Sequence, residues 1–229
     1  MMRGCSESGF DEFYRKYLGL DNGTEMDGCL LCRSEHRDEP LNKRYFYRVI
    51  VTDYNGKRVV SCPPALQDEK PKKLCAAAGG KALEEAGRAL QAPDGFSGGF
   101  MYRMTRDEGE DIKSCGQSSD WAEKHIEFRY LPEMKKFLAI SGEDLAGYCK
   151  ISDVYDGYGN IVVWVDEKYR RQGIAAELAA RTILQCGKDG IIPMYVVRTG
   201  NLPSVALAEK LGFHTVQTEY VISEERDPG

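Results

Sequence analysis

The spacing of apolar residues predicts a first half that mixes helix and strand. Residues 10–18 place aromatic and apolar side chains at helical spacing, which predicts an amphipathic helix. Residues 44–53 and 57–62 are rich in aromatic and β-branched residues, and Asn55-Gly56 between them is typical of a hairpin turn. A further helix is predicted over residues 73–90, weakened by two internal glycines. This half is therefore α plus β, and its motifs indicate no particular chemistry.

The pattern changes near the middle of the chain. Residues 96–120 carry glycines, serines and a run of charges with few apolar residues, which predicts a boundary or a long active-site loop. Beyond them the elements become regular. In order, the pattern predicts strands at 136–140, 145–152 and 161–165, a helix at 174–186, a strand at 191–197, a helix at 201–211 and a strand at 213–222.

Two of these strands have telling compositions. Residues 161–165 form a continuous apolar run, which is typical of a central strand covered on both faces. Residues 191–197 contain Pro193, which lacks a backbone donor and indicates an edge, a bulge or a splayed pair at that point. The second half therefore resembles one mixed α/β layer structure.

Composition narrows the functional classes. The chain has 229 residues, 42% of them hydrophobic and 29% charged, with a net charge of −5. These values are typical of a globular protein, and no apolar run approaches the roughly 20 residues that a membrane span needs. No basic stripe with interleaved aromatic residues occurs, so we expect neither a nucleic-acid nor a membrane partner. The first residues lack an apolar signal region, which favours a cytoplasmic location.

The cysteines allow one alternative chemistry. The chain has eight, and Cys29 and Cys32 have the spacing of a metal or redox pair. Among nearby residues only His36 and Cys62 are candidate further ligands, which does not match a zinc site. We therefore expect ordinary, reduced, half-buried thiols and no metal, with a redox or structural role for the pair as the alternative.

A loop between predicted strand and helix carries the chemistry. Residues 170–175, Arg-Arg-Gln-Gly-Ile-Ala, follow the strand at 161–165 and open the next helix. The first amides of a helix have no internal acceptor and lie at the positive end of its dipole, so they bind anions. Gly173 permits close approach, and Arg170 and Arg171 add positive charge. Taken alone, this glycine could simply start a helix.

The order of motifs resembles the GNAT superfamily of acetyl-CoA-dependent N-acetyltransferases. Residues 163–175 are similar to the family's cofactor strand and pyrophosphate loop, and residues 201–213 are similar to its second motif. The resemblance covers residues 128–222. It implies a GNAT acyl-CoA N-acyltransferase fold of the α+β (mixed α/β) class, with a mixed sheet splayed between 161–165 and 191–197.

The resemblance also implies the contacts to acetyl-CoA, the cosubstrate. The strand backbone would pair with the pantetheine arm, the loop amides would bind the pyrophosphate, and the start of the later helix would contact the pantetheine. These cofactor-binding positions are Val163, Trp164, Val165, Arg170, Arg171, Gln172, Gly173, Ile174, Ala175, Ala176, Asn201 and Ser204. Apart from any such contact, Trp164 and Phe213 favour an interpretation as core aromatics.

The expected catalytic positions depart from the family pattern. Many relatives carry a tyrosine acid where this chain has Ala208, and a glutamate base near the start of the cofactor strand, where it has Gly159-Asn160. We expect Tyr195 or Ser204 to act near the thiol. At the acceptor end the candidates are Asp156, Asp153 and Tyr158. An aspartate in a turn also serves local hydrogen bonding, so Asp156 has a structural interpretation too.

These observations predict an N-acetyltransferase that moves an acetyl group from acetyl-CoA to a primary amine of a small molecule by direct attack. Residues 119–229 would form the GNAT domain. Residues 1–118 would form an α+β region, like that of some bacterial two-part GNAT proteins, that shapes the acceptor site; a homodimer is compatible with both. The alternative is a non-catalytic acyl-CoA-binding or sensor protein, and acyl chain length is left open.

Overall fold

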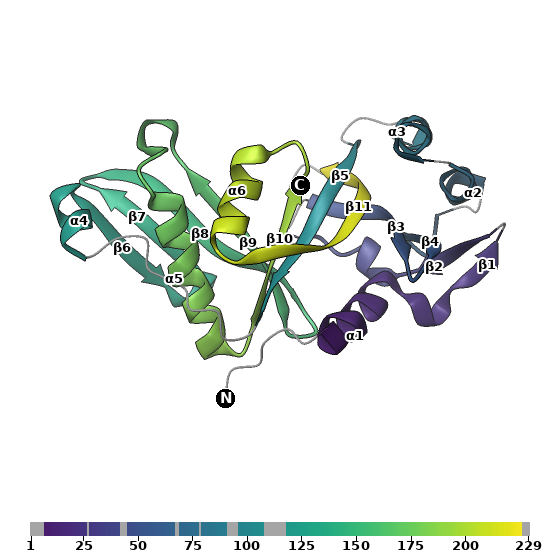
Figure 1. The fold of residues 1–229 in the computed structure, drawn as a ribbon, viewed down its shortest axis with the longest axis horizontal. Coiled ribbons are helices and arrows are strands. Elements are labelled where there is room, and N and C mark those ends of the chain that lie inside the picture. Colours follow the sequence, from purple (N-terminus) through teal and green to yellow (C-terminus); the bar gives the residue numbers. More distant parts are fainter. Residues whose placement is uncertain are drawn as a thin grey trace. The chain divides into compact units, whose positions relative to one another are not determined.

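A computed structural model describes residues 7–26, 28–41, 45–66, 69–77, 79–90, 96–107 and 118–225. Its chain forms two compact units, drawn in Figure 1. The N-terminal unit contains residues 7–103 and 216–225, and the C-terminal unit contains residues 104–215, as far as they are described. The boundary that we predict between residues 118 and 119 stays a proposal.

The N-terminal unit is built on a sheet with strand order β1-β2-β4-β3-β11. Strands β2 and β4 are parallel, and the other neighbours are antiparallel. Its elements are α1 (Glu7–Leu18), η1 (Leu20–Asn22), β1 (Thr24–Met26), β2 (Cys29–Arg33), η2 (Glu35–Arg37), β3 (Tyr45–Tyr54), β4 (Lys57–Cys62), α2 (Glu69–Cys75), α3 (Gly79–Leu90) and most of β5 (Phe96–Arg106) and β11 (Phe213–Glu225). The predicted first helix and the hairpin at Asn55-Gly56 are confirmed.

Two predictions for this half are wrong. The single helix expected over residues 73–90 is two helices, because α2 ends at Cys75 and α3 begins at Gly79. The loop expected from residue 96 starts as strand β5. This strand contains buried Arg103 and Thr105, whose polar character hides the strand pattern in the sequence. Residues 108–117 of the expected loop lie outside the described residues, and residues 118–120 belong to helix α4 (Ser118–Glu123).

A buried ion pair explains how β5 tolerates its arginine. Arg103 is 1% exposed, and its Nε lies 2.7 Å from Oε1 of Glu219 on β11. The Tyr14 hydroxyl of α1 donates to the same carboxylate oxygen at 2.7 Å. The Arg103 guanidinium also lies over the Tyr17 ring, 4.6 Å from its centroid. Burial first, and then the Glu219 charge, raise the pKa of Tyr14, so its phenol stays a donor. The Glu219 carboxylate thus binds both the Arg103 guanidinium and the Tyr14 hydroxyl inside the unit.

The cysteine prediction also needs correction. Cys29 on β2 forms a disulfide with Cys75 at the end of α2, with Cα atoms 5.4 Å apart. Cys32 and Cys62 lie outside this disulfide and are fully buried rather than half-buried. The partner of Cys29 is 46 residues away in sequence, so local spacing could not reveal it. Among the described residues, no group of His, Cys, Asp and Glu is arranged to hold a metal ion.

The C-terminal unit has a sheet of order β10-β9-β8-β7-β6, parallel between β9 and β10 and antiparallel elsewhere. Its elements are α4 (Ser118–Glu123), β6 (Ile126–Leu131), η3 (Pro132–Met134), β7 (Lys136–Ser141), β8 (Asp144–Tyr155), β9 (Tyr158–Val165), η4 (Glu167–Tyr169), α5 (Ile174–Asp189), β10 (Ile192–Arg198) and α6 (Leu202–Lys210). The strands and helices predicted after residue 136 are confirmed, as is the mixed α/β class. Helix α5 packs on β7, β8 and β9 of this sheet (Figure 1).

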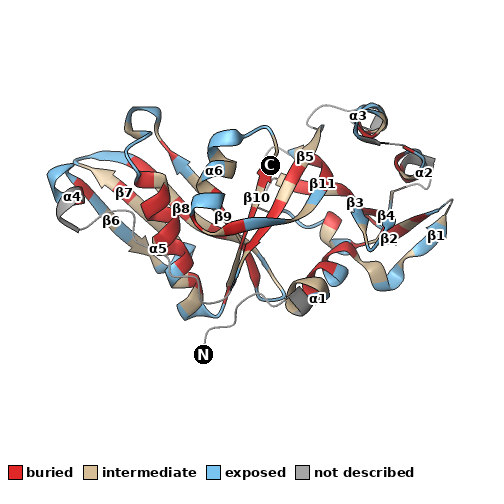
Figure 2. Cartoon of the chain, viewed as in Figure 1, coloured by how far each residue is buried: buried red, intermediate tan, exposed pale blue. Residues whose placement is uncertain are grey.

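Burial in this unit follows α5, whose sheet-facing residues are largely buried (Figure 2). Two residues differ from expectation. Glu177 lies outside the apolar stripe of the sequence, yet it is 2% exposed, because Arg181 binds its Oε1 at 2.8 Å. Trp164 is 40% exposed and stacks on Tyr148 of β8, so its interpretation as a core aromatic is wrong. Phe213 is buried, as predicted. Strand β9 is therefore not covered on both faces along its whole length.

No helix in the described part of the chain is long and apolar enough to cross a membrane.

Candidate functional site

The candidate site begins where strands β9 and β10 part. Their register pairs residues 192–194 with residues 158–160 and stops there, although both strands continue for several residues. The splay expected between 161–165 and 191–197 is therefore present, and Pro193 lies within the short paired segment. An opening between two parallel strands exposes backbone groups that a ladder would otherwise use.

Alternation along β9 tells which backbone groups face the opening. The Ile192 amide donates to Gly157 O at 2.8 Å, so odd-numbered residues of this region direct their polar groups to β10. On the other side, the Asp166 amide donates to Ala146 O at 3.0 Å, so even-numbered residues serve β8. Val163 and Val165 consequently direct their backbone groups to the opening, and those of Trp164 are directed to β8.

The loop after β9 is held by its own side chains. Asp166 caps the turn η4 by accepting the Lys168 amide at 3.1 Å. The Arg170 Nε donates to Val165 O at 3.1 Å, and Gln172 Nε2 donates to Lys168 O at 3.3 Å. The side chains of Arg170 and Gln172 are thus engaged within the loop. The loop therefore leaves its backbone and the exposed Arg171 side chain to a ligand.

Two left-handed residues turn this backbone into the start of α5. Arg171 has φ 62° and Gly173 has φ 88°, and Gly173 is the N-cap of the helix. The first intrahelical bond runs from the Glu177 amide to Gly173 O at 3.1 Å. The amides of Ile174, Ala175 and Ala176 therefore precede the ladder and lie at the positive end of a 16-residue helix. This is the geometry that binds phosphate groups.

Helix α6 contributes a second set of polar groups. The Asn201 side chain caps it by accepting the Ser204 amide at 3.4 Å. The hydroxyls of Ser204 and of Tyr195 on β10 lie 2.9 Å apart. Ala208, one helical turn after Ser204, is fully buried. The structure thus brings together Tyr195 and Ser204, two of the three catalytic candidates.

The Tyr195 side chain is buried. Its side chain is 3% exposed, and burial raises its pKa, an effect that the Ser204 hydrogen bond partly opposes. The phenol is therefore protonated at neutral pH.

The third candidate, Asp156, lies elsewhere. It is an exposed residue in the tight turn between β8 and β9, with φ 45°. This turn is next to the closed end of the β9–β10 pair, whereas Tyr195 lies beyond the paired segment.

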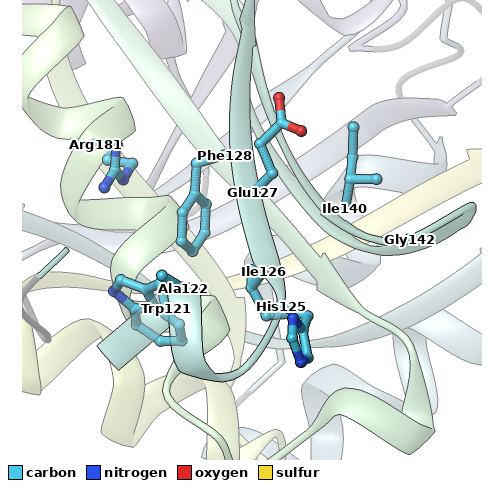
Figure 3. Close-up of a pocket in the computed structure, with 9 residues that line it drawn as sticks. All are labelled: Trp121, Ala122, His125, Ile126, Glu127, Phe128, Ile140, Gly142 and Arg181. Carbon is cyan, nitrogen blue, oxygen red and sulfur yellow. The ribbon is translucent and has the colours of Figure 1, made fainter. Parts of the chain in front are cut away.

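A pocket of about 580 Å³ lies beside the loop, between α4, β6, β7 and α5. Figure 3 shows Trp121 and Phe128 next to one another, with Arg181 on α5. The two rings meet edge to face at 5.3 Å, and the Arg181 guanidinium lies 4.6 Å from the centroid of Phe128. The other residues that line the pocket are Ala122, His125, Ile126, Glu127, Ile140 and Gly142.

Two residues of α4 and its following turn reach the loop, and the sequence analysis missed both. A Cβ atom built on Gly173 would lie 3.5 Å from the Trp121 ring. Lys124 donates to Gln172 O at 3.5 Å, and its ammonium lies 4.9 Å from the centroid of Trp121. The only signal in the sequence is an aromatic residue and a lysine three positions apart in a polar segment, which is too common to be informative.

An opened parallel pair followed by a helix start with unpaired amides is an arrangement suited to a phosphate-containing ligand. A family model described as GNAT acetyltransferase matches residues 102–222, more than half of the chain. The chain belongs to the GNAT acetyltransferase family.

The chain is also similar to individual proteins and solved structures. The uncharacterized N-acetyltransferase YdfB of Bacillus subtilis (strain 168) is 35% identical over 86 residues, which are 38% of this chain and 33% of that protein. The chain thus matches about a third of the length of this curated relative. A GCN5-related N-acetyltransferase-like protein from Streptococcus suis 89/1591 shares the fold, with 17% identity, 78% and 83% of the two chains covered, and a TM-score of 0.52. An acetyltransferase of the GNAT family from Colwellia psychrerythraea aligns over 97% and 98% of the two chains at 10% identity, with a TM-score of 0.47.

Proposed function

We propose that the protein is an N-acetyltransferase that transfers the acetyl group of acetyl-CoA to a primary amine of a small molecule. The observation that carries this proposal is the opening between β9 and β10 together with the helix start at Gly173. Coenzyme A has an amide-containing arm and a pyrophosphate. The backbone groups of Val163 fit the first, and the amides of residues 174–176 fit the second. Family membership supports the same cosubstrate.

The cofactor contacts extend along the proposed route. Val165 follows on the same strand, with its carbonyl already engaged by Arg170. The backbone groups of Trp164 are directed to β8, so Trp164 would contact the cofactor through its exposed side chain. Arg171 is exposed and available to the phosphates, and Asn201 and Ser204 lie at the start of α6. The remaining proposed cofactor positions are Arg170, Gln172, Gly173, Ile174, Ala175 and Ala176.

The chemical step that we propose is direct attack. The amine nitrogen forms a bond to the thioester carbonyl carbon, the carbon–sulfur bond breaks, and the amine proton goes to a base while the thiolate accepts a proton. Tyr195 is the proposed acid for the thiolate, because its buried phenol keeps its proton and Ser204 orients it. It reaches α6 one turn before Ala208, so its phenol replaces the tyrosine that relatives carry at that position. Asp156 is the proposed base at the acceptor end.

Calorimetric titration with acetyl-CoA tests the binding half of the proposal. We expect a dissociation constant of micromolar order, which is about −8 kcal/mol. Turnover is tested separately, by incubating the protein with acetyl-CoA and a panel of primary amines and following the free thiol. Absence of binding would rule out the proposed function.

The second candidate is a non-catalytic acyl-CoA-binding or sensor protein. Buried Ala208 and the amide of Asn160, where relatives have an acid and a base, favour this alternative. Binding without thiol release for any amine of the panel would support it. Thiol release above the rate without amine would exclude it, and repeating the assay with longer acyl donors would define the acyl group.

A further inference from the structure

The β9–β10 ladder ends on a side chain rather than on a backbone carbonyl. Amides of β10 that face β9 are those of Ile192, Met194 and Val196, because alternate residues of a strand serve the same neighbour. In an unbroken register the Val196 amide would donate to the Ile161 carbonyl. It donates instead to Oδ1 of Asn160, at 3.0 Å.

Asn160 is tied to both of its neighbouring strands. Its backbone pairs with Ser152 of β8, whose hydroxyl lies 3.5 Å from the Asn160 carbonyl oxygen. Its side chain is tied to β10 through Val196. The residue is half-buried and is the last of β9 in register with β10. It is therefore placed at the point where the sheet opens.

We propose that Asn160 is a positioning residue that holds the opening between β9 and β10 apart for the pantetheine arm. By occupying the Val196 amide, its carboxamide keeps that donor from closing another rung with Ile161. The Ile161 carbonyl and the Val163 amide are then left to a ligand. The inference rests on the proposed function, since the arm of coenzyme A is the ligand in question.

The physical reason is the cost of an unpaired amide. A backbone N–H with limited access to water needs an acceptor, and Val196 is half-buried. Without the Asn160 side chain, the nearest acceptor in register is the Ile161 carbonyl, and pairing with it would narrow the opening to the spacing of an ordinary ladder. An alternative role as catalytic base is not open to Asn160, because a carboxamide takes up no proton at neutral pH.

Two ligands distinguish a role in holding the opening from a general loss of structure. Coenzyme A contains the pantetheine arm, and 3′-phospho-ADP contains the pyrophosphate without the arm. For Asn160→Ala, titration at a temperature where the protein is fully folded should show coenzyme A bound about tenfold more weakly. The affinity for 3′-phospho-ADP should stay within about twofold of wild type, because the loop and the α5 start are unaffected.

Two further variants serve as rescue and control. Asn160→Asp keeps an acceptor oxygen at the same distance along the side chain and should bind coenzyme A within about threefold of wild type. Ser152→Ala removes the contact on the β8 side of Asn160 and should change neither ligand's affinity. Melting temperatures of all three variants show whether each is folded.

Several outcomes would overturn the inference. If Asn160→Ala lowers the affinities for both ligands equally, or lowers neither, the carboxamide does not act on the opening for the pantetheine arm. An aspartate variant as weak as the alanine variant would show that the acceptor atom is not responsible. Wild-type protein that binds 3′-phospho-ADP but not coenzyme A would exclude the opening as the arm's site. Wild-type protein that binds neither would instead refute the proposed function itself.

Discussion

The two units differ in where their polar groups find partners. In the N-terminal unit the buried charge of Arg103 is matched by Glu219, and Tyr14 binds the same carboxylate. In the C-terminal unit the backbone of Val163 faces an opening, and the amides at the start of α5 precede its hydrogen-bond ladder. A group satisfied inside the protein stabilises the fold, whereas a group left without an internal partner is available to a ligand. On this comparison we propose that ligand binding belongs to the C-terminal unit, whereas the buried ion pair contributes to the cohesion of the N-terminal unit.

The largest expected effect concerns the buried ion pair of the N-terminal unit. Glu219→Gln keeps the shape of the side chain but leaves the Arg103 charge buried without a countercharge. Breaking a buried pair from one side should lower the free energy of unfolding by about 3–5 kcal/mol. Urea unfolding followed by circular dichroism measures the change.

An exposed pair is the matched control for Glu219. Glu25 binds Lys57 on the surface, with side chains 72% and 61% exposed. Glu25→Gln should leave the free energy of unfolding almost unchanged, because surface pairs contribute little. Equal losses in the two variants would mean that the Arg103 cluster does not hold the unit together.

The second-largest expected effect concerns the start of α5, where the backbone amides precede the helical hydrogen bonds. Gly173→Asp places a carboxylate at the helix start and puts a non-glycine residue at φ 88°. We expect acetyl-CoA affinity to fall at least about 100-fold, equivalent to about 2.7 kcal/mol, through repulsion of the pyrophosphate and distortion of the loop. Calorimetric titration measures the loss.

The other end of the same helix supplies the control. Gly190 caps the C-terminus of α5 at φ 68°, and a Cβ atom there would meet nothing within 4 Å. Gly190→Asp imposes a similar backbone strain away from the loop, so it should lower stability but leave acetyl-CoA affinity within about threefold. Similar affinity losses in both variants would contradict a phosphate site at Gly173.

A third prediction concerns the one hydroxyl pair of the proposed site. Tyr195→Phe removes the acid and leaves Ser204 without the 2.9 Å partner. We expect kcat to fall about tenfold and the dissociation constant of acetyl-CoA to stay within about twofold, because the acid acts on the thiolate and not on binding. Steady-state rates together with calorimetry separate the two quantities. A variant with weaker binding and unchanged kcat would assign Tyr195 to packing instead.

The sequence predicted the site region better than the N-terminal unit, for a reason that the same comparison explains. Strand β9, the loop and α5 are consecutive, so their order and the position of Gly173 could be identified locally. Strand β5 was missed because Arg103 is made compatible with burial by Glu219, 116 residues later. The Cys29–Cys75 bond was missed for a similar reason.

Within the site, the limit of prediction is the side-chain partner. The sequence identified Tyr195 and Ser204 separately as candidates, but their contact depends on how β10 meets α6. Asn160 was noted only as a departure from the family's glutamate. Its bond to the Val196 amide depends on the register of two strands, which the sequence does not contain.

The smallest expected effect tests whether water is excluded from the core of the C-terminal unit, away from the proposed site. Cys149 on β8 and Cys186 on α5 are both buried. Burial raises the pKa of their thiols to about 12, from a usual value of 9.0. A pKa raised on folding favours the folded state below pH 9, and this contribution is lost as pH rises from 9 towards 12. At pH 9 each thiol should already cost a few tenths of a kcal/mol relative to pH 7. Comparing urea unfolding of wild type with that of a Cys149→Ala, Cys186→Ala double variant at both pH values isolates the thiols, since other titrating groups are shared. If both proteins lose the same stability between pH 7 and 9, water reaches these thiols, and the contrast between the open site and a dry core beneath α5 does not hold.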